Sequence, residues 1–342
     1  MSKNPIEIIG GGVAGLSLAH GLAQRGVRVR VCEALTYPRH RLCGEFINGV
    51  SDETLNCLGI GKIFTDAQQH QEMTWWRGST KFLDRRLESP VRALSRWQMG
   101  RRLVEAVRDA GGEVQERSRI GQIDKVSEGR VWAAGRKATR GSQWLGLKAH
   151  FLGVEMSEGL EMHLGEGGYV GLTPVEEGRI NVCGLFKKRS QMGGKGPRVL
   201  LNYLRACELS ELANRLAEAG PDETSVCGVS GIHFGNQGQD DELVTIGDAE
   251  RMIPPFTGNG MSMALEAAEC ALEPLQQFSL GESSWNEVRA EISKRVANRF
   301  RLRMGAALRL QPLLTHPGGQ HLLKGLARPG LLPVHFLHQL LT

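Results

Sequence analysis

The stretch IEIIGGGVAGLSLAHGLAQRGVRVRVCE, residues 6–33, decides the fold. Its first four residues predict a short buried strand, and an Ala- and Leu-rich helix follows a glycine turn and ends near Gly26. A second strand then alternates Val with Arg and ends on Glu33. The turn carries the GxGxxG spacing with Gly10, Gly12 and Gly15. This order of strand, turn, helix, strand and acid is typical of a Rossmann-type dinucleotide site.

Each part of this stretch has a physical role in such a site. Gly10 permits the tight turn, Gly12 lets the backbone approach a pyrophosphate, and Gly15 lets the helix pack closely on the strand. The start of the helix, which includes Val13 and Ala14, offers free N–H groups and a partial positive charge to phosphates. Glu33 stands where a carboxylate can accept hydrogen bonds from an adenosine ribose.

The overall composition is that of a globular protein. The 342 residues suffice for one large domain or two interlocked ones, with 41% hydrophobic and 23% charged residues. The net charge of +5 is concentrated in the tail, because the chain from Glu291 onward carries eight Lys or Arg against that one acid. Basic residues confined to a tail with few aromatic residues do not favour nucleic-acid binding.

The seven cysteines are scattered, odd in number and contain no CxxC pair, which argues against a disulfide framework and against a zinc site. We therefore predict no metal site and a reducing, cytoplasmic location. No apolar run reaches the length of a transmembrane helix.

A second strong signal is DELVTIGDAERMIPPFTGNGMSMALEAAECALEPL, residues 241–275. A buried strand ends in Gly247 and Asp248, and ligands bind at the carboxyl ends of parallel strands. A helix then begins near Gly260 and directs its N–H groups at the same place. A carboxylate beside a helix N-terminus suits a polyol chain next to an electron-accepting ring.

The middle of the chain is richer in strands. Residues 70–95 predict one or two strands, residues 144–186 alternate with period two, and Arg96 opens an amphipathic helix. We therefore expect an α/β protein in three parts. These are a composite nucleotide domain (1–69, 96–141 and 235–280), an inserted, mainly antiparallel sheet domain (70–95 and 142–234) and a helical C-terminal segment (281–342), broken at Pro312, Pro317, Pro329 and Pro333.

Several motifs, in this order, resemble the FAD-dependent oxidoreductases that include the geranylgeranyl reductase family and the class A flavoprotein monooxygenases. They are GGGVAGLSLAHGLAQRGVRVRVCE, RLCGEF, SRWQMGRRL, VWAAGRKA, GGYVGLTPVEEGRINVCGL and GDAERMIPPFTGNGMSMALEAA. The resemblance covers nearly the whole chain. It implies a Rossmann-type (GR2-like) FAD-binding domain with an inserted substrate sheet, and FAD as the cofactor.

The resemblance also assigns residues. It implies that the glycine turn and Glu33 hold the ADP half of FAD, that Arg41 and Arg96 contact phosphates or ribose, and that Asp248, after Gly247, binds the ribitol. The residues expected to line the isoalloxazine are Pro255, Gly258, Gly260 and Met261.

Two further motifs supply candidate catalytic residues. RLCGE is similar to the KxCGG or KxCGE segment of the reductases, which places Cys43 and Gly44 near the flavin. Tyr169 and Pro174 fall on a YxWxFP motif that faces the substrate, but here Tyr169 is followed by Val-Gly-Leu-Thr, which makes an isoprenoid substrate less favoured. His150 and His163 are possible bases, although a single histidine in a sheet is more often structural.

Three functions stay open at this point. We favour a monooxygenase that hydroxylates or oxidises an apolar aromatic or polyketide-like molecule, with NADPH or NADH as a possible electron donor. The first alternative is a reductase of double bonds in a prenyl or polyene chain, with Cys43 as a proton relay. The second is a non-catalytic flavoprotein whose basic tail contacts a partner protein or, peripherally, an anionic membrane.

Overall fold

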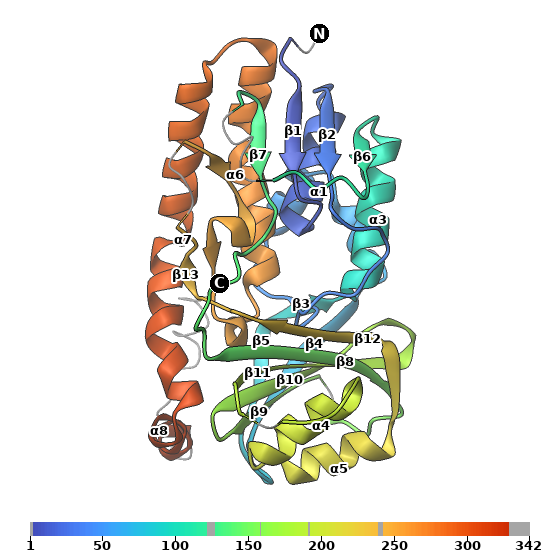
Figure 1. Ribbon diagram of the computed structural model, residues 1–342, viewed down its shortest axis with the longest axis vertical. Helices are drawn as coiled ribbons and strands as arrows, with labels where there is room; N and C mark the ends of the chain where they lie inside the picture. The colour runs from blue at the N-terminus through green and yellow to red at the C-terminus, as the bar shows by residue number, and fades with distance from the viewer. Residues whose placement is uncertain (1–2, 122–126, 158, 191, 239–241, 328–342) are drawn as a thin grey trace.

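Two sheets and a long C-terminal helix pair organise the molecule (Figure 1). The computed structural model describes residues 3–121, 127–157, 159–190, 192–238 and 242–327. In the view of Figure 1 the parallel sheet lies in the upper half, and the larger sheet crosses the lower half.

The upper sheet is the predicted Rossmann-type sheet. Its five strands are parallel and run in the order β14-β7-β1-β2-β6. Strand, glycine turn, helix and strand follow one another as expected. The bounds are β1 Ile6–Ile9, α1 Val13–Gln24, β2 Val29–Cys32, β6 Glu113–Gln115, β7 Arg130–Trp132 and β14 Val244–Thr245.

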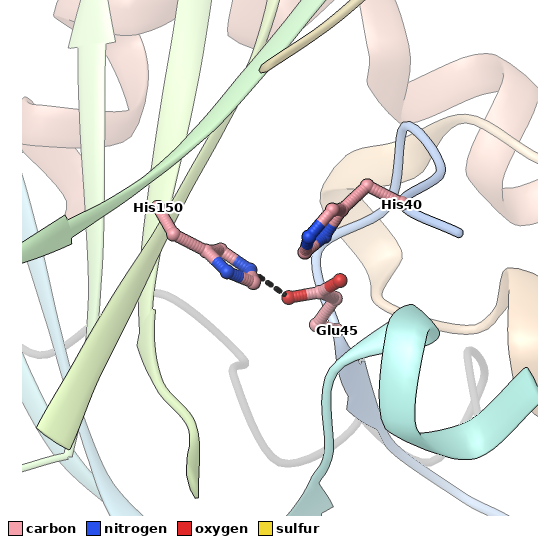
Figure 2. A group of neighbouring side chains, drawn as sticks. All are labelled: His40, Glu45 and His150. Atoms are coloured by element: carbon pink, nitrogen blue, oxygen red, sulfur yellow. Dashed lines mark hydrogen bonds and ion pairs between the residues drawn. The ribbon is translucent and has the colours of Figure 1, made fainter. Parts of the chain in front are cut away.

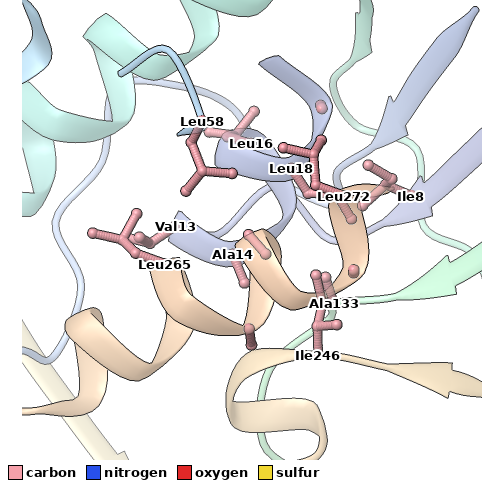
Figure 3. Packing of buried hydrophobic residues seen from close by; sticks show 14 of the residues in the cluster. Ile8, Val13, Ala14, Leu16, Leu18, Leu58, Ala133, Ile246, Leu265 and Leu272 are labelled. Carbon is pink, nitrogen blue, oxygen red and sulfur yellow. The ribbon is translucent and has the colours of Figure 1, made fainter. Parts of the chain in front are cut away.

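Three helices pack beside this sheet and enclose the main core: α1, α3 (Arg96–Asp109) and α6 (Gly260–Leu280). Ile8 on β1, Leu18 on α1 and Leu272 on α6 are almost fully buried and lie together (Figure 3). At about 25 cal/mol per Å² of apolar surface, such burial fixes α1 against the strand and thereby sets the position of the glycine turn. The short helix α2 (Asp52–Cys57) is capped by the Ser51 hydroxyl, which accepts a hydrogen bond from Thr54 N.

The lower sheet has eight strands in the order β12-β8-β11-β10-β9-β4-β5-β3. Neighbouring strands are antiparallel except β4 and β9, which are parallel, so the sheet is mixed. The bounds are β3 Phe46–Ile47, β4 Gln68–Arg77, β5 Thr80–Ala93, β8 Trp144–Leu152, β9 Leu160–Gly165, β10 Gly168–Pro174, β11 Arg179–Lys187 and β12 Gly220–Ser230.

The boundaries expected for this sheet need one correction. β3 belongs to the lower sheet although it lies within the segment assigned to the nucleotide domain, because Phe46 and Ile47 pair with β5. β12 lies within the expected segment, and its first half is polar. The two-stranded ribbon of β13 (Gly235–Asn236) and β15 (Arg251–Met252) lies outside both sheets.

The lower sheet has two different faces. Leu147, Ala149 and Phe151 on β8 pack in one core with α4 (Pro197–Ala206) and α5 (Ser210–Glu218). Because side chains alternate along a strand, Lys148 and His150 point to the opposite face, toward the parallel sheet. We call this second side the inner face.

The C-terminal segment is a long helix, α7 (Trp285–Thr315), followed by α8 (Pro317–Ala327). α7 runs beside α6 and reaches down to the lower sheet (Figure 1). The expected break at Pro317 is confirmed, because α7 ends at Thr315, His316 is extended, and Pro317 starts α8, a position that proline favours. The expected break at Pro312 was wrong, because this exposed residue lies within the last turn of α7, where few hydrogen bonds are lost. Pro329 and Pro333 lie outside the described residues.

The C-terminal segment is partly buried. One side of α7 enters the main core through its buried apolar residues Trp285, Val288, Ile292, Val296 and Phe300. Among the described residues, no helix combines the length and apolarity needed to cross a membrane.

Candidate functional site

The glycine turn after β1 is tightly packed except at one position. Gly10 has φ +108°, and a Cβ there would lie 2.4 Å from the Ala133 carbonyl oxygen. A Cβ on Gly15 would lie 2.1 Å from the Gly10 carbonyl oxygen. Gly12 is different, because nothing lies within 4 Å of a Cβ built there. The turn therefore offers an open backbone approach at Gly12, as a pyrophosphate requires.

A cavity that is partly open to solvent lies at this open backbone. Gly12 and Val13 at the N-terminus of α1 form one part of its lining. The cationic side chains of Arg39, Arg41 and Arg96 form another part. The Nε atoms of Arg39 and Arg96 are buried and have no hydrogen-bond partner among the described residues. Buried guanidinium donors without acceptors fit the phosphate groups of a dinucleotide.

Glu33 ties the arginine loop to the glycine turn. Its carboxylate accepts hydrogen bonds from Gly11 N at 2.8 Å and Leu35 N at 3.0 Å, and it pairs with Arg39 at 2.8 Å. Burial opposes ionisation of this acid, but the Arg39 charge and the two amides keep its pKa below the ordinary value. Tyr37 donates to the Gly11 carbonyl oxygen at 2.5 Å and holds the same loop. A ribose would share the Glu33 carboxylate with Arg39.

A second cavity, also partly open to solvent, lies at the carboxyl end of β14. Gly247, Asp248 and Gly260 are among the residues that line it. Removal from water raises the pKa of Asp248 to about 6, and the charges of Arg96 and Arg136 oppose this rise. The charge of Arg96 therefore acts on both cavities. A poorly hydrated carboxylate beside the start of α6 fits the hydroxyl groups of a ribitol chain.

The other residues predicted to line the isoalloxazine are placed differently. The Phe46 ring covers Gly258, where a Cβ would lie 2.1 Å from Cε2 of that ring. Met261 is buried in the main core. Pro255 begins a short turn, Pro255–Thr257, that positions Phe256. Of these predicted residues, Gly260 is the one that lines the second cavity.

A buried ionic network connects the loop after β2 with the inner face. The Glu45 carboxylate accepts from Lys148 Nζ at 2.5 Å, His150 Nε2 at 2.6 Å and Arg96 N at 2.8 Å. Burial opposes its ionisation, but His150 and Lys148 lower the pKa of Glu45 below the ordinary value. Since Glu45 has φ +60°, the network holds a strained backbone in place. It fixes the loop, the start of α3 and β8 relative to one another.

His40 lies edge-on to His150 beside the same carboxylate (Figure 2). Burial and the charges of Lys148 and His150 lower the pKa of His40 to about 4, so its ring is neutral near pH 7. One potential ligand atom each from His40, Glu45 and His150 lies within 4.8 Å of the others. However, the Lys148 ammonium already neutralises the carboxylate, which disfavours a cation there.

Cys43 lies beside this network. Its carbonyl oxygen accepts from Asn181 Nδ2 at 3.0 Å, and its Sγ accepts from Glu45 N at 3.4 Å. Gly44 leaves room for the Phe46 ring, which lies 3.1 Å from a Cβ built on that glycine. The RLCGE loop is therefore fixed against the inner face of β11, with Leu42 packed on the apolar part of that face.

Apolar and aromatic side chains cover the other part of the inner face. This aromatic cluster contains Leu42, Trp75, Phe82, Trp144, Met162, Leu164, Tyr169, Leu185, Phe256 and Leu314. The Tyr169 hydroxyl accepts from Phe256 N at 3.2 Å and points its proton to Gln311 Oε1 at 3.4 Å. Burial raises the pKa of Tyr169 far above its ordinary value, so the hydroxyl stays neutral and acts through hydrogen bonds.

His163 is structural. It lies on the opposite face, where it pairs with Glu161 at 2.8 Å and stacks on Trp76. Arg215 on α5 pairs with the same Glu161 at 2.6 Å. Burial is the main reason that the pKa of His163 is lowered. His163 therefore agrees with the expectation that a single histidine in a sheet is more often structural. His150, in contrast, lies on the inner face.

The sequence predictions omitted four residues of this site: Tyr37, Glu45, Lys148 and Gln311. One signal was available, since Lys148 and His150 alternate with apolar residues in LGLKAHFLG and so had to share one face. A lysine on a strand without an exposed face needs an acidic partner. Nothing in the local sequence identified Glu45 as that partner.

Comparisons with known proteins agree with this geometry. The FAD binding domain family matches residues 3–152. Menaquinone reductase of Mycobacterium tuberculosis is 23% identical over 91% of this chain and 84% of its own. Digeranylgeranylglycerophospholipid reductase 2 of Methanothermobacter thermautotrophicus is 26% identical over 79% and 77%. p-Nitrophenol 4-monooxygenase of Pseudomonas putida has the same fold, with a TM-score of 0.77, 14% identity and coverage of 99% and 96%.

Proposed function

Because this chain is an FAD-dependent oxidoreductase whose residues 3–152 match the FAD binding domain family, we propose that it hydroxylates or oxidises an apolar, aromatic or polyketide-like small molecule. One observation carries this proposal: the aromatic cluster covers the inner face directly beside the RLCGE loop and the Pro255–Thr257 turn. Leu42 of the RLCGE loop and Phe256 of the turn are themselves part of the aromatic cluster. An apolar substrate bound there lies next to the side of the molecule that holds the cofactor.

The chain offers binding groups for two parts of FAD. In this proposal Gly12, the start of α1 and three arginines hold the pyrophosphate, and Asp248 with the start of α6 holds the ribitol. When bound, FAD supplies the redox chemistry, with NADPH or NADH as the proposed electron donor. The protein's own contribution is orientation and the exclusion of water, since Tyr169, Leu164 and Leu185 are each at most 3% exposed.

A reductase of double bonds is the alternative, favoured by the relatives rather than by the pocket. Both curated relatives named above are reductases. Cys43 then has a role as a proton relay near the flavin, and Cys43→Ala lowers turnover far more than FAD content. Equal activity of this variant removes Cys43 from the mechanism. Against this alternative, Gly171 and Thr173 stand where the reductase motif has Trp and Phe.

The outer side of α7 and α8 supports a further part of the proposal, contact with an anionic membrane. Leu302 is 71% exposed and Leu322 is 53% exposed. No ion pair to Arg301, Arg309 or Lys324 occurs in the part of the chain that the structure describes. No acid follows Glu291 in the sequence. Exposed leucines among unpaired cations fit the surface of an anionic bilayer, where an apolar substrate dissolves. If the chain is a non-catalytic flavoprotein, the second alternative, it acts only through binding at this surface.

Oxygen dependence separates the two enzymes. The FAD-loaded protein is mixed with NADPH, or NADH, and 1-naphthol as an aromatic probe, first under nitrogen and then in air. For a monooxygenase we expect the probe to accelerate nicotinamide oxidation in air, together with oxygen uptake, and no sustained turnover under nitrogen. Turnover of a polyene under nitrogen, without any effect of the aromatic probe in air, would contradict the hydroxylase.

A further inference from the structure

Two buried N–H donors at the aromatic cluster have no hydrogen-bond partner. They are Nε1 of Trp75 on β4 and Nε2 of Gln311 on α7. Gln311 is only 7% exposed, and its hydrogen-bond partner Tyr169 belongs to the aromatic cluster. An unpaired buried donor costs about 1–3 kcal/mol, so two of them on one surface indicate a ligand that supplies acceptors.

The orientation of the Gln311 amide follows from its neighbour. The oxygen of Tyr169 accepts the N–H of Phe256, so the hydroxyl proton of Tyr169 needs another acceptor. The Gln311 carbonyl oxygen provides it at 3.4 Å, which leaves the NH₂ group without a partner. Tyr169 therefore acts as a positioning residue that presents a donor, the Gln311 NH₂ group, to the cluster.

A row of residues on the inner face leads from one donor toward the other. Trp75 lies opposite Met162, and Met162 lies opposite Gly171, so the three share one row across β4, β9 and β10. Tyr169, which holds Gln311, lies on the same face, one step further along β10. A Cβ on Gly171 would have no described atom nearer than 3.9 Å. The glycine therefore leaves the backbone uncovered at this point of the row.

We propose that this site binds a planar ring that carries acceptor oxygens, a quinone or a phenol, over Gly171, with Gln311 and Trp75 donating hydrogen bonds to the ring oxygens. The inference rests on the proposed function and deepens it, because it names the substrate class and the residues that select it. Ring oxygens satisfy both unpaired donors, whereas a hydrocarbon chain satisfies neither.

Equilibrium dialysis of the FAD-loaded protein tests the inference without any turnover. The probes are 2-methyl-1,4-naphthoquinone, 1-naphthol and 2-methylnaphthalene, which share a ring system and differ in oxygen. We expect both oxygenated probes to bind about tenfold or more tightly than the hydrocarbon, since each hydrogen bond contributes a several-fold gain. The better of the two oxygenated probes then distinguishes a quinone from a phenol.

Variants assign the effect to residues. Gln311→Met keeps the side-chain shape but removes the donor, and it lowers the affinity of the better oxygenated probe about tenfold while changing that of 2-methylnaphthalene less than about twofold. Trp75→Phe has the same selective effect. Gly171→Leu weakens binding of all three probes because its side chain covers the backbone at this point of the row. Gln277→Met on α6 serves as the matched control and changes none of them.

Two results overturn the inference: equal affinities for the three probes, or a Gln311→Met variant that weakens all probes alike. The FAD absorbance of every variant is recorded, so that loss of fold or cofactor is recognised separately. Because binding is measured without NADPH or oxygen, selective binding without oxygen-dependent turnover would contradict the proposed function alone. Turnover of 1-naphthol without selective binding would contradict the inference alone.

Discussion

Replacing Asp248 by Asn separates the stability of the protein from its affinity for FAD. The burial of this carboxyl group raises its pKa from 3.8 to about 6, so the folded protein resists its ionisation. Such a shift corresponds to roughly 3 kcal/mol at about 1.4 kcal/mol per tenfold change in proton affinity. Because the group lines a cavity that is partly open to solvent, water screens it, and we expect about 1–2 kcal/mol.

The sign follows from linkage. A raised folded-state pKa means that the folded protein binds the proton more tightly than the unfolded chain, so ionisation of Asp248 costs stability as the pH rises from about 4 through 6. The neutral amide that replaces the carboxyl group in the variant avoids that cost. Without FAD, Asp248→Asn is therefore more stable than the wild type at about pH 7.5, and the difference is smaller near pH 4.5 and disappears below about pH 3, where Asp248 is protonated in both the folded and the unfolded state.

Urea unfolding of the FAD-free proteins at both pH values measures this difference. The comparison between variant and wild type is needed because His40, whose pKa is lowered to about 4, acts in the opposite direction over the same range. We expect the same substitution to weaken FAD binding, since a carboxylate is the stronger acceptor for ribitol hydroxyls. A variant that is no more stable at high pH, or equally stabilised at both pH values, would refute the reasoning.

Three further predictions concern the turn, the buried network and the tail. Gly12→Ala leaves the unfolding free energy within about 0.5 kcal/mol but weakens FAD binding measured by fluorescence titration, whereas Gly15→Ala destabilises the fold itself because its Cβ meets the Gly10 carbonyl oxygen. Lys148→Met leaves Glu45 buried without its cation and costs about 3–5 kcal/mol in urea unfolding. Reversing the charge of three tail residues abolishes flotation with vesicles rich in phosphatidylglycerol: Arg301, Arg309 and Lys324.

Each of these has a matched control. Gly12→Ala with wild-type FAD affinity would remove the open backbone from the binding site. The double variant Glu45→Gln with Lys148→Met regains part of the lost stability, because it removes both charges, and no recovery would contradict the ion-pair argument. Vesicles of phosphatidylcholine bind neither form, and salt weakens binding to the anionic ones. Equal flotation of wild type and variant would rule out charge as the cause.

The sequence predicted those parts of the site that depend on local backbone geometry. The turn at Gly10–Gly15 and the Gly247–Asp248 corner lie where the motifs placed them, because a short strand followed by a glycine turn and a helix specifies its own geometry. The α/β architecture, with a parallel sheet, a second sheet and C-terminal helices, was likewise confirmed. The parallel pairing of β4 with β9 was not predictable, since nothing in either segment records its partner.

The residues that the sequence missed act across long separations. Glu45 pairs with Lys148, which lies 103 residues later in the chain. Tyr169 donates a hydrogen bond to Gln311, which lies 142 residues later. Such pairs form when separately folded parts of the chain pack together, and no local sequence pattern specifies which residues then come into contact. Pro312 was misread for a related reason, because the packing of α7 on α6 outweighs the loss of one hydrogen bond near the end of the helix.

The uptake of FAD tests the central claim most directly. The purified protein is titrated with FAD, and its absorbance spectrum is recorded before and after NADPH or NADH is added under nitrogen, and again in air. We predict a yellow protein with one FAD per chain that bleaches with the nicotinamide and regains its colour in air. A colourless protein that takes up no FAD would contradict the account.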